Sequence, residues 1–291
     1  MYSIEKELKI LQQFVKPEHL DNEKNWRCYS EDEISMAEER LHIKLPHPIR
    51  EVYLHMANLM LSFYLRPLEL VHWDKDYLGF FLNADDGIVI GIKRDDLSEG
   101  IYAWEETDPE CIAWEYEEDF ETAYSEHDEE SQKELARKYQ EYWEKLNANP
   151  EHSPLQIVRW ENGPRYNHTI DGYSLFLVIH ALCEVEEMER NSTPNDPTIY
   201  FSEAFSGHTL EYFQALDRRV RADFVPLSDH PELLEQDDMP MQMVYVHKNP
   251  DALLIQREAW INCELLTKSV PERSFIEKVQ EQIGLSFRCD F

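Results

Sequence analysis

Residues 30–58 constrain the fold of this chain more than any other segment, because they predict two short helices separated by a fixed break. Ser30 and Glu33 have the spacing of a capping box, which places the start of the first helix there. Pro46 and Pro48 end that helix, and Pro48 also suits the first turn of the next one. Each helix carries an apolar stripe at helical spacing, formed by Ile34, Ala37, Leu41 and Ile43 in the first and by Ile49, Val52, Tyr53 and Met56 in the second.

The order of elements in this segment resembles the opening motif of the SUKH superfamily. That family includes many bacterial immunity proteins and a fungal regulator of cell-wall synthesis. The matching residues are Glu38 and Leu41 on the capped helix, the pair Leu45-Pro46, and Arg50 and Tyr53 on the second helix. The family often has a Gly-rich or Asn-Gly turn next, whereas this chain continues ANLMLSFYL. That departure leaves the turn open and allows a longer apolar helix.

The resemblance extends downstream and covers about residues 1 to 190. Residues 79–116 are similar to the strand region of the family, with strands expected at 80–82, 88–92, 101–104 and 111–114. Residues 119–124 resemble the helix that follows. The expected fold is SUKH-like and α+β. It has a mixed or antiparallel sheet of five or more strands, with helices packed on one side and at the ends.

A polar break, NSTPNDP at residues 191–197, is the predicted domain boundary. It separates a SUKH-like domain, residues 1–190, from a C-terminal extension of strands and helix, residues 191–291. The extension is either a separate module or part of the same fold. Further elements are predicted from periodicity: helices at 3–16, 117–147, 172–188 and 271–283, and paired strands at 242–247 and 253–261.

The formal net charge of −31 restricts the class of partner. It excludes nucleic-acid binding through the usual phosphate contacts, which need a basic surface, and it opposes binding to an anionic membrane. It fits a basic protein partner, because opposite fields raise the rate of encounter. Plain solubility is the alternative explanation.

Cysteine usage and hydropathy point to the cytoplasm. The five cysteines are an odd number without a CxxC pair, which indicates reduced thiols. No apolar run approaches the length of a membrane span, and the N-terminus predicts an amphipathic helix instead of a secretory signal. With 42% hydrophobic and 12% aromatic residues, the chain has the composition of a protein with a packed core.

Motifs of catalysis and cofactor binding do not occur in the sequence. It has no HExxH, no GxSxG and no Gly-rich phosphate loop, and it contains only eight glycines. Cys183 and His180 have i, i+3 spacing, but a cysteine on an apolar helix is usually a core residue. His127 and His152 fall in polar stretches and are interpreted as surface residues. We therefore predict a chain that is not an enzyme, with no catalytic, cofactor-binding or metal-binding residues and no cofactor.

One constellation favours binding. From residue 105 to residue 130 half of the positions are acidic, lysine and arginine are absent, and aromatic residues are interspersed. Aromatic anchors and carboxylates together suit a basic protein partner, while a solvated loop over a sheet edge is the other interpretation. The predicted partner-binding residues are Trp104, Glu105, Glu106, Asp108, Glu117, Glu118 and Asp119.

The resemblance implies a non-catalytic binding protein of the cytoplasm. In bacterial members of the family this function is the neutralisation of toxins, many of them nucleases. The expected mechanism is occlusion of the basic, substrate-binding face of a toxin by the acidic surface. A regulatory or scaffold adaptor related to the cell-wall-synthesis regulators is one alternative, and a hydrolase with an unrecognised site is another. The sequence does not identify the toxin or the oligomeric state.

Overall fold

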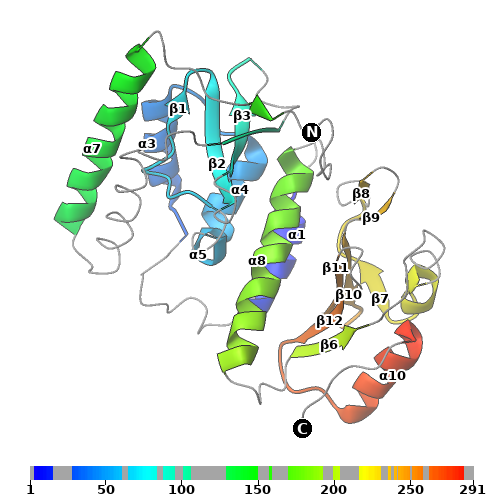
Figure 1. The fold of residues 1–291 in the computed structure, drawn as a ribbon. Coiled ribbons are helices and arrows are strands. Elements are labelled where there is room, and N and C mark those ends of the chain that lie inside the picture. The colour runs from blue at the N-terminus through cyan, green and yellow to red at the C-terminus, as the bar shows by residue number, and fades with distance from the viewer. Residues whose placement is uncertain are drawn as a thin grey trace. The chain divides into compact units, whose positions relative to one another are not determined.

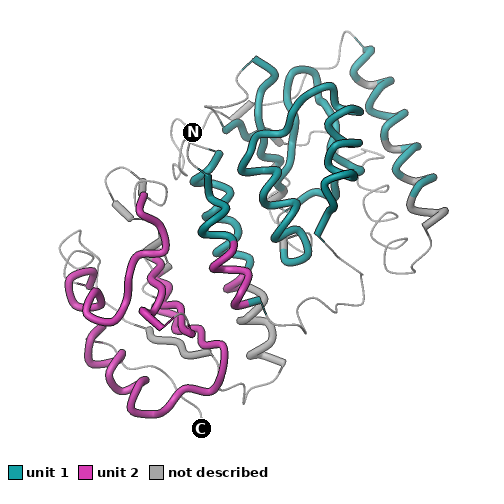
Figure 2. The backbone as a smooth tube through the Cα atoms, turned by 180° about the vertical axis from the view of Figure 1, so that it is seen from behind, with its two compact units in different colours: residues 1–8, 15–181 teal, residues 9–14, 182–291 magenta. Residues whose placement is uncertain are grey.

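The computed structural model describes residues 3–15, 28–60, 65–83, 88–95, 101–105, 129–149, 157–158, 170–192, 199–203, 216–230, 235–236, 239–240, 242–249, 251–257 and 262–284. In these residues the chain is α+β and contains two separate larger sheets (Figure 1). It divides into two compact units, residues 1–8 with 15–181 and residues 9–14 with 182–291 (Figure 2). The division falls inside helix α8 (Ile170–Ser192), which continues into the predicted break at 191–197. The boundary at 190/191 stays a prediction.

The helix pair predicted at residues 30–58 is confirmed. Helix α3 (Glu31–Leu41) begins with the expected capping box, in which Ser30 Oγ accepts from Glu33 N and the Glu33 carboxylate accepts from Ser30 N at 2.8 Å. It ends at His42, whose φ of 55° is left-handed. Helix α4 (His47–His55) follows, with a proline in its first turn. A short helix, α5 (Ala57–Met60), continues the apolar stretch where the family often has a turn.

The first sheet has the order β1-β2-β3-β4-β5, and all neighbours are antiparallel. Its strands are β1 (Trp73–Asp74), β2 (Tyr77–Asn83), β3 (Ile88–Lys93), β4 (Tyr102–Glu105) and β5 (Ile157–Val158). The strands expected at 80–82, 88–92 and 101–104 are therefore present, while residues 111–114 and 119–124 lie outside the described residues. One face of the sheet is apolar and buried through Leu78, Phe81, Ile90, Ile92 and Ala103.

The C-terminal end of helix α7 (Glu129–Ala148) is hydrogen-bonded to the turn between β1 and β2. The Asn147 side chain accepts a hydrogen bond from the backbone N–H of Lys75 at 2.7 Å and donates one to the carbonyl of Trp73. In return, Lys75 Nζ donates to the carbonyls of Asn147 at 3.0 Å and Asn149 at 2.8 Å. A lysine is well suited to this place, because the last carbonyls of a helix lack intrahelical partners.

The C-terminal strands form a sheet of their own instead of extending the first one. It has the order β6-β12-β11-β10-β7 and is antiparallel throughout. Its strands are β6 (Ile199–Glu203), β7 (Phe224–Pro226), β10 (Gln242–His247), β11 (Ala252–Arg257) and β12 (Asn262–Thr267), and β8 (Glu235–Gln236) pairs separately with β9 (Met239–Pro240). The predicted hairpin is thus confirmed as β10–β11, although β11 ends at Arg257 and β12 was not predicted.

Helix α10 (Arg273–Ile283) closes the second unit, as the sequence predicts for residues 271–283. Its residues Ile276, Val279 and Ile283 share a buried apolar cluster with side chains of the sheet, among them Leu254 and Leu265. The helix ends at Gly284 with a φ of 74°, a conformation in which glycine carries no steric penalty. At the other end of the chain, helix α1 (Glu5–Leu11) and a 3-10 turn (Gln12–Phe14) place Leu8 and Leu11 in the interior.

None of the helices in the described ranges is both long enough and apolar enough to cross a membrane. The longest of them, α8, has buried apolar residues from Leu175 to Leu182, with the half-buried His180 between them.

Two glycines of the first sheet make different demands on its packing, and we expect different results from substituting them. A Cβ on Gly79 would overlap Val89 Cγ1 and lie 3.2 Å from Trp104 Cζ2, so the contact is with side chains. A Cβ on Gly91 would overlap the backbone carbonyl of Leu78, which cannot rotate away. We expect Gly79→Ala to lower the free energy of unfolding by ~1–3 kcal/mol and Gly91→Ala to lower it further.

Urea denaturation of the single and double variants measures both effects. Val89→Ala removes the clashing methyl group, so the double variant with Gly79→Ala should recover stability relative to the sum of the two single changes. The same second change should not rescue Gly91→Ala. Equal rescue of both glycine variants would contradict the described packing.

Candidate functional site

Three aromatic rings gather on the side of the first sheet opposite its apolar core face. Tyr77 lies on β2, and Tyr102 and Trp104 lie on β4. The ring centroids of Tyr77 and Tyr102 are 5.7 Å apart at 65°, and those of Tyr77 and Trp104 are 5.6 Å apart at 51°. Tyr77 and Tyr102 are half-buried, while Trp104 is only 3% exposed. Such tilted pairs are favourable because the edge of one ring meets the face of the other.

The structure places two of the predicted partner-binding residues at this cluster. Trp104 forms its buried part, and Glu105 is the last residue of β4. Glu106, Asp108, Glu117, Glu118 and Asp119 lie outside the described residues, so the binding role of the acidic run stays a prediction. Because Trp104 is buried, the exposed aromatic area belongs to Tyr77 and Tyr102. Sequence reasoning placed Tyr102 on the face of Trp104 but missed Tyr77, which comes from another strand.

The cations beside this cluster are held by neighbouring side chains, one of them acidic and one aromatic. Lys93, which lies opposite Tyr77 across the β2–β3 ladder, forms an ion pair with Asp95 at 3.1 Å. Its hydrogen bond to Asp95 raises the pKa of Lys93. The guanidinium of Arg94 lies 3.9 Å from the centroid of the Trp73 ring, a distance typical of a cation–π contact. These lysine and arginine charges are therefore engaged by neighbouring side chains.

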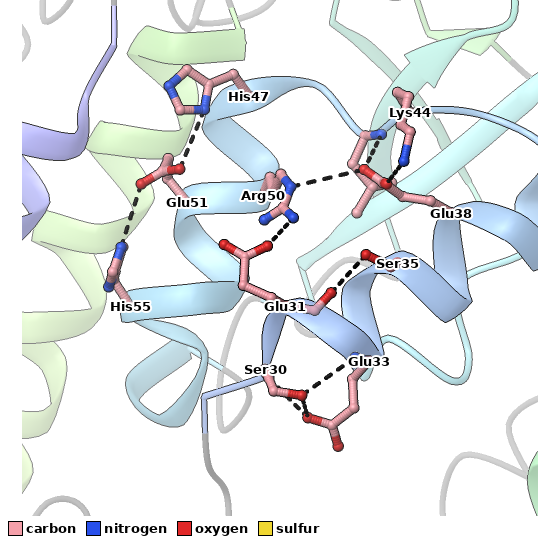
Figure 3. Close-up of polar contacts among 11 residues, drawn as sticks. Ser30, Glu31, Glu33, Ser35, Glu38, Lys44, His47, Arg50, Glu51 and His55 are labelled. Atoms are coloured by element: carbon pink, nitrogen blue, oxygen red, sulfur yellow. Dashed lines mark hydrogen bonds and ion pairs between the residues drawn. The ribbon is translucent and has the colours of Figure 1, made fainter.

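A polar network joins α3 to α4 around the buried carboxylate of Glu38, which is 4% exposed (Figure 3). One oxygen of Glu38 accepts the backbone N–H of Leu45 at 3.1 Å, and the other pairs with Lys44. Arg50 Nε lies 4.0 Å from Glu38, and Arg50 Nη2 pairs with Glu31. The hydrogen bond that Arg50 donates to the Glu31 carboxylate raises the pKa of Arg50. This network fixes the break between the two helices, which is a structural role.

A second polar group follows one face of α4, at four-residue intervals. His47 Nδ1 lies 3.3 Å from Glu51 Oε1, and His55 Nε2 lies 3.4 Å from Glu51 Oε2 (Figure 3). The two imidazoles thus approach different oxygens of one carboxylate. In the described part of the chain, no three His, Cys, Asp or Glu side chains converge as ligands of a metal ion. Sequence reasoning did not single out these residues, although their i, i+4 spacing was the available signal.

Two side chains from the helix pair, the half-buried Arg40 and the buried Tyr53, also hold the loop at residues 65–72. Arg40 donates to the carbonyls of Leu68 and Val71, both at 2.8 Å. The Tyr53 hydroxyl donates to the carbonyl of Arg66 at 2.8 Å. Burial lowers the pKa of Arg40 and raises the pKa of Tyr53. Because these bonds satisfy backbone carbonyls, the polar cluster stabilises one loop conformation.

His72, at the end of the same loop, packs against Trp143 of α7. Its ring stacks on Trp143 with centroids 3.8 Å apart and a 20° tilt, and its Nδ1 lies 2.8 Å from the carbonyl oxygen of Leu70. Burial, reinforced by the positive charge of Arg66, lowers the pKa of His72. The imidazole is therefore neutral at physiological pH, with Nδ1–H as the donor to Leu70.

The cysteines of the described ranges differ in their accessibility. Cys183 and Cys263 are fully buried, and Cys28 is half-buried with its Sγ 3.1 Å from Asn58 Oδ1. Burial raises the pKa of the Cys263 thiol to about 12. Because the thiolate is the nucleophile, Cys263 is unreactive in the folded protein. Burial of Cys183 agrees with its interpretation as a core residue. Cys111 and Cys289 lie outside the described residues.

No protein-family model, no curated protein and no solved structure matches the chain. Its function is therefore inferred from its own residues and contacts.

Glu38 gives the clearest test of the helix-pair network. In Glu38→Ala the backbone N–H of Leu45 is left buried without its acceptor, and we expect the free energy of unfolding to fall by ~1–3 kcal/mol. The neighbouring Glu39 is exposed, so Glu39→Ala is a matched control with an expected change within about 0.5 kcal/mol. Urea denaturation followed by circular dichroism measures both. Equal effects of the two variants would contradict a structural role for Glu38.

Thiol accessibility tests the core of the second unit, which contains both Cys183 and Cys263. We expect a maleimide reagent at neutral pH to modify Cys28 in the folded protein long before Cys263 or Cys183, because the latter two are buried and the Cys263 thiol stays protonated. In denaturant all three should react alike. Mass spectrometry of the labelled peptides identifies each site. Fast labelling of Cys263 in the folded protein would show that the second sheet is not packed as described.

Proposed function

We propose that this chain is a non-catalytic binding protein with a SUKH-like fold in its first unit. In this proposal it acts in the cytoplasm as an immunity protein, and it neutralises a basic, nuclease-type toxin by covering the toxin's nucleic-acid-binding face. The observation that carries the proposal is the position of β4. This strand holds an aromatic cluster at its end, and the chain passes from there directly into the acidic run of residues 105–130.

Electrostatics supports a basic partner. The chain carries a net charge of −31, and half of the residues from 105 to 130 are acidic with no lysine or arginine among them. A charge cluster of one sign destabilises its own fold by self-repulsion, which favours an explanation in which the cluster has a use. A toxin that acts on nucleic acid presents a basic face, so the acidic run steers it into an encounter and competes with phosphate groups.

The fixed geometry of β4 supports the same function. β4 pairs with β3 on one side and, at Ala103 and Trp104, with β5 on the other. A strand paired on both sides needs no loop to protect its edge, which weakens the interpretation of the acidic run as an edge cover. Tyr77 and Tyr102 supply partly exposed aromatic area on a strand that is held on both sides, and such anchors lose little conformational entropy on binding.

The first step of the test is to identify the partner. The full chain is used as bait in an extract of its native host, and the captured proteins are identified by mass spectrometry. We expect a basic protein with a nuclease-type activity that is inhibited when the chain is added. Inhibition at one-to-one stoichiometry supports occlusion, whereas chemical modification of the captured protein would contradict it.

The second step tests the acidic run with the purified partner. The test variant replaces Glu105, Glu106, Glu117 and Glu118 with Gln. This change should lower the association rate at low salt by about tenfold or more and flatten the salt dependence of that rate. The matched control replaces four exposed carboxylates elsewhere on the chain with Gln, namely Glu141, Glu144, Glu277 and Glu281. Both variants gain the same charge. Equal on-rates for the two variants in stopped-flow experiments would show that net charge alone matters and that the binding face lies elsewhere.

A further inference from the structure

Side chains on one face of α7 attach this helix to the loop at residues 65–72 and to β1 (Figure 1). Gln140 Nε2 donates to the carbonyl of Glu69 at 3.2 Å. The Trp143 ring stacks on His72, and Asn147 donates to a backbone carbonyl of β1. The three α7 residues are spaced at i, i+3 and i+7, which places them on one side of the helix. Of these contacts, the one to His72 depends on a group that titrates near neutral pH.

His72 takes part in this attachment as a neutral ring. It is 7% exposed, and its centroid lies 3.8 Å from that of Trp143 with a tilt of 20°. Its Nδ1–H donates to the carbonyl of Leu70 at 2.8 Å, so the ring needs no second proton to keep this hydrogen bond. A second proton would place a positive charge inside the contact between the loop and α7.

The nearby cations oppose that charge. Arg66, on the loop itself, is 1% exposed, and its positive charge lowers the pKa of His72. Arg40 reaches the loop from α3, where it donates to two backbone carbonyls, and its charge acts in the same direction. From α7, the side chains of Gln140 and Trp143 carry no charge.

The carboxyl groups of this stretch do not reverse the balance. Glu69 accepts a hydrogen bond from the Tyr29 hydroxyl at 2.8 Å, and Asp74 is buried on β1. The pKa of His72 is lowered even so, and burial is the largest cause. The face of Trp143 attracts a cation, but weakly compared with the cost of burying a charge.

Protonation of His72 therefore weakens the attachment of α7. When α7 is released, the imidazole meets water and regains its ordinary pKa of ~6.5. The released state then binds the proton more readily than the attached state. The attachment is at full strength above pH ~6.5 and weakens as the pH falls below that value, by at most about tenfold per pH unit for a single proton.

We propose that His72 is a pH-sensitive switch that releases α7 from the loop and from β1 in mild acid, while the rest of the first unit stays folded. The helix pair and the first sheet have their own contacts and do not need α7 to form. Glu129 and Glu130, in the first turn of α7, belong to the acidic run that starts at the end of β4. Release thus detaches an element that borders the run. The effect on partner binding rests on the proposed function, whereas the switch itself does not.

Hydrogen–deuterium exchange of the full-length chain, read by mass spectrometry and corrected for the intrinsic effect of pH, tests the switch. Between pH 7.5 and pH 5.5 we expect the protection of α7 peptides to fall by about tenfold, while peptides of β2 and β3 keep theirs. His72→Phe keeps a ring against Trp143 but takes up no proton, so its α7 protection should not change over this range. His230→Phe, at an exposed histidine of the second unit, is the matched control and should respond like the wild type.

Three results would overturn the proposal. Wild-type α7 could keep its protection at pH 5.5, His72→Phe could lose protection as the wild type does, or both units could lose protection equally, which is general acid unfolding. If His72→Phe does not fold, His72→Gln replaces it, because its amide can still donate to the Leu70 carbonyl. These measurements use the chain alone, so failure to capture a basic partner would count against the proposed function and not against the switch.

Discussion

The buried carboxylate of Glu38 is the interaction on which the first unit depends. It accepts the backbone N–H of Leu45 and pairs with Lys44, so it fixes the break between α3 and α4. Once that break is fixed, Arg40 on α3 and Tyr53 on α4 bond to backbone carbonyls of the loop at residues 65–72. That loop leads into β1 and the first sheet. A buried charge without partners is costly, and here the same partners that satisfy Glu38 also set the geometry of the helix pair.

The first sheet carries the start of the acidic run, because β4 ends at Glu105. β4 pairs on both sides, and its tryptophan packs over Gly79, where a larger residue would collide with Val89. The start of the acidic run is thereby tied to a rigid element. Preorganisation of this kind matters for a binding protein, because contacts that are already ordered cost less conformational entropy when a partner arrives.

Helix α4 shows how one periodicity produces two faces. Ile49, Val52 and Tyr53 are fully buried, while His47, Glu51 and His55 form a polar stripe. The buried face is visible in the sequence because apolar residues recur at helical spacing. The polar stripe shows in the sequence only as an i, i+4 spacing, and its contact with Ser3 is not visible there because Ser3 comes from another part of the chain.

The sequence by itself determined the local structure: the capping box at Ser30, the proline break at Pro46, the β10–β11 hairpin and the closing helix at residues 273–283. These depend on neighbouring residues, which a single sequence displays. Only the tertiary structure decided that the C-terminal strands form a sheet of their own, that Trp104 is buried beside Tyr77, and that Ser3 meets His47. Those contacts join residues distant in the chain, and burial depends on what packs against a side chain. Local pattern fixes which face of an element is apolar, but not which element covers it.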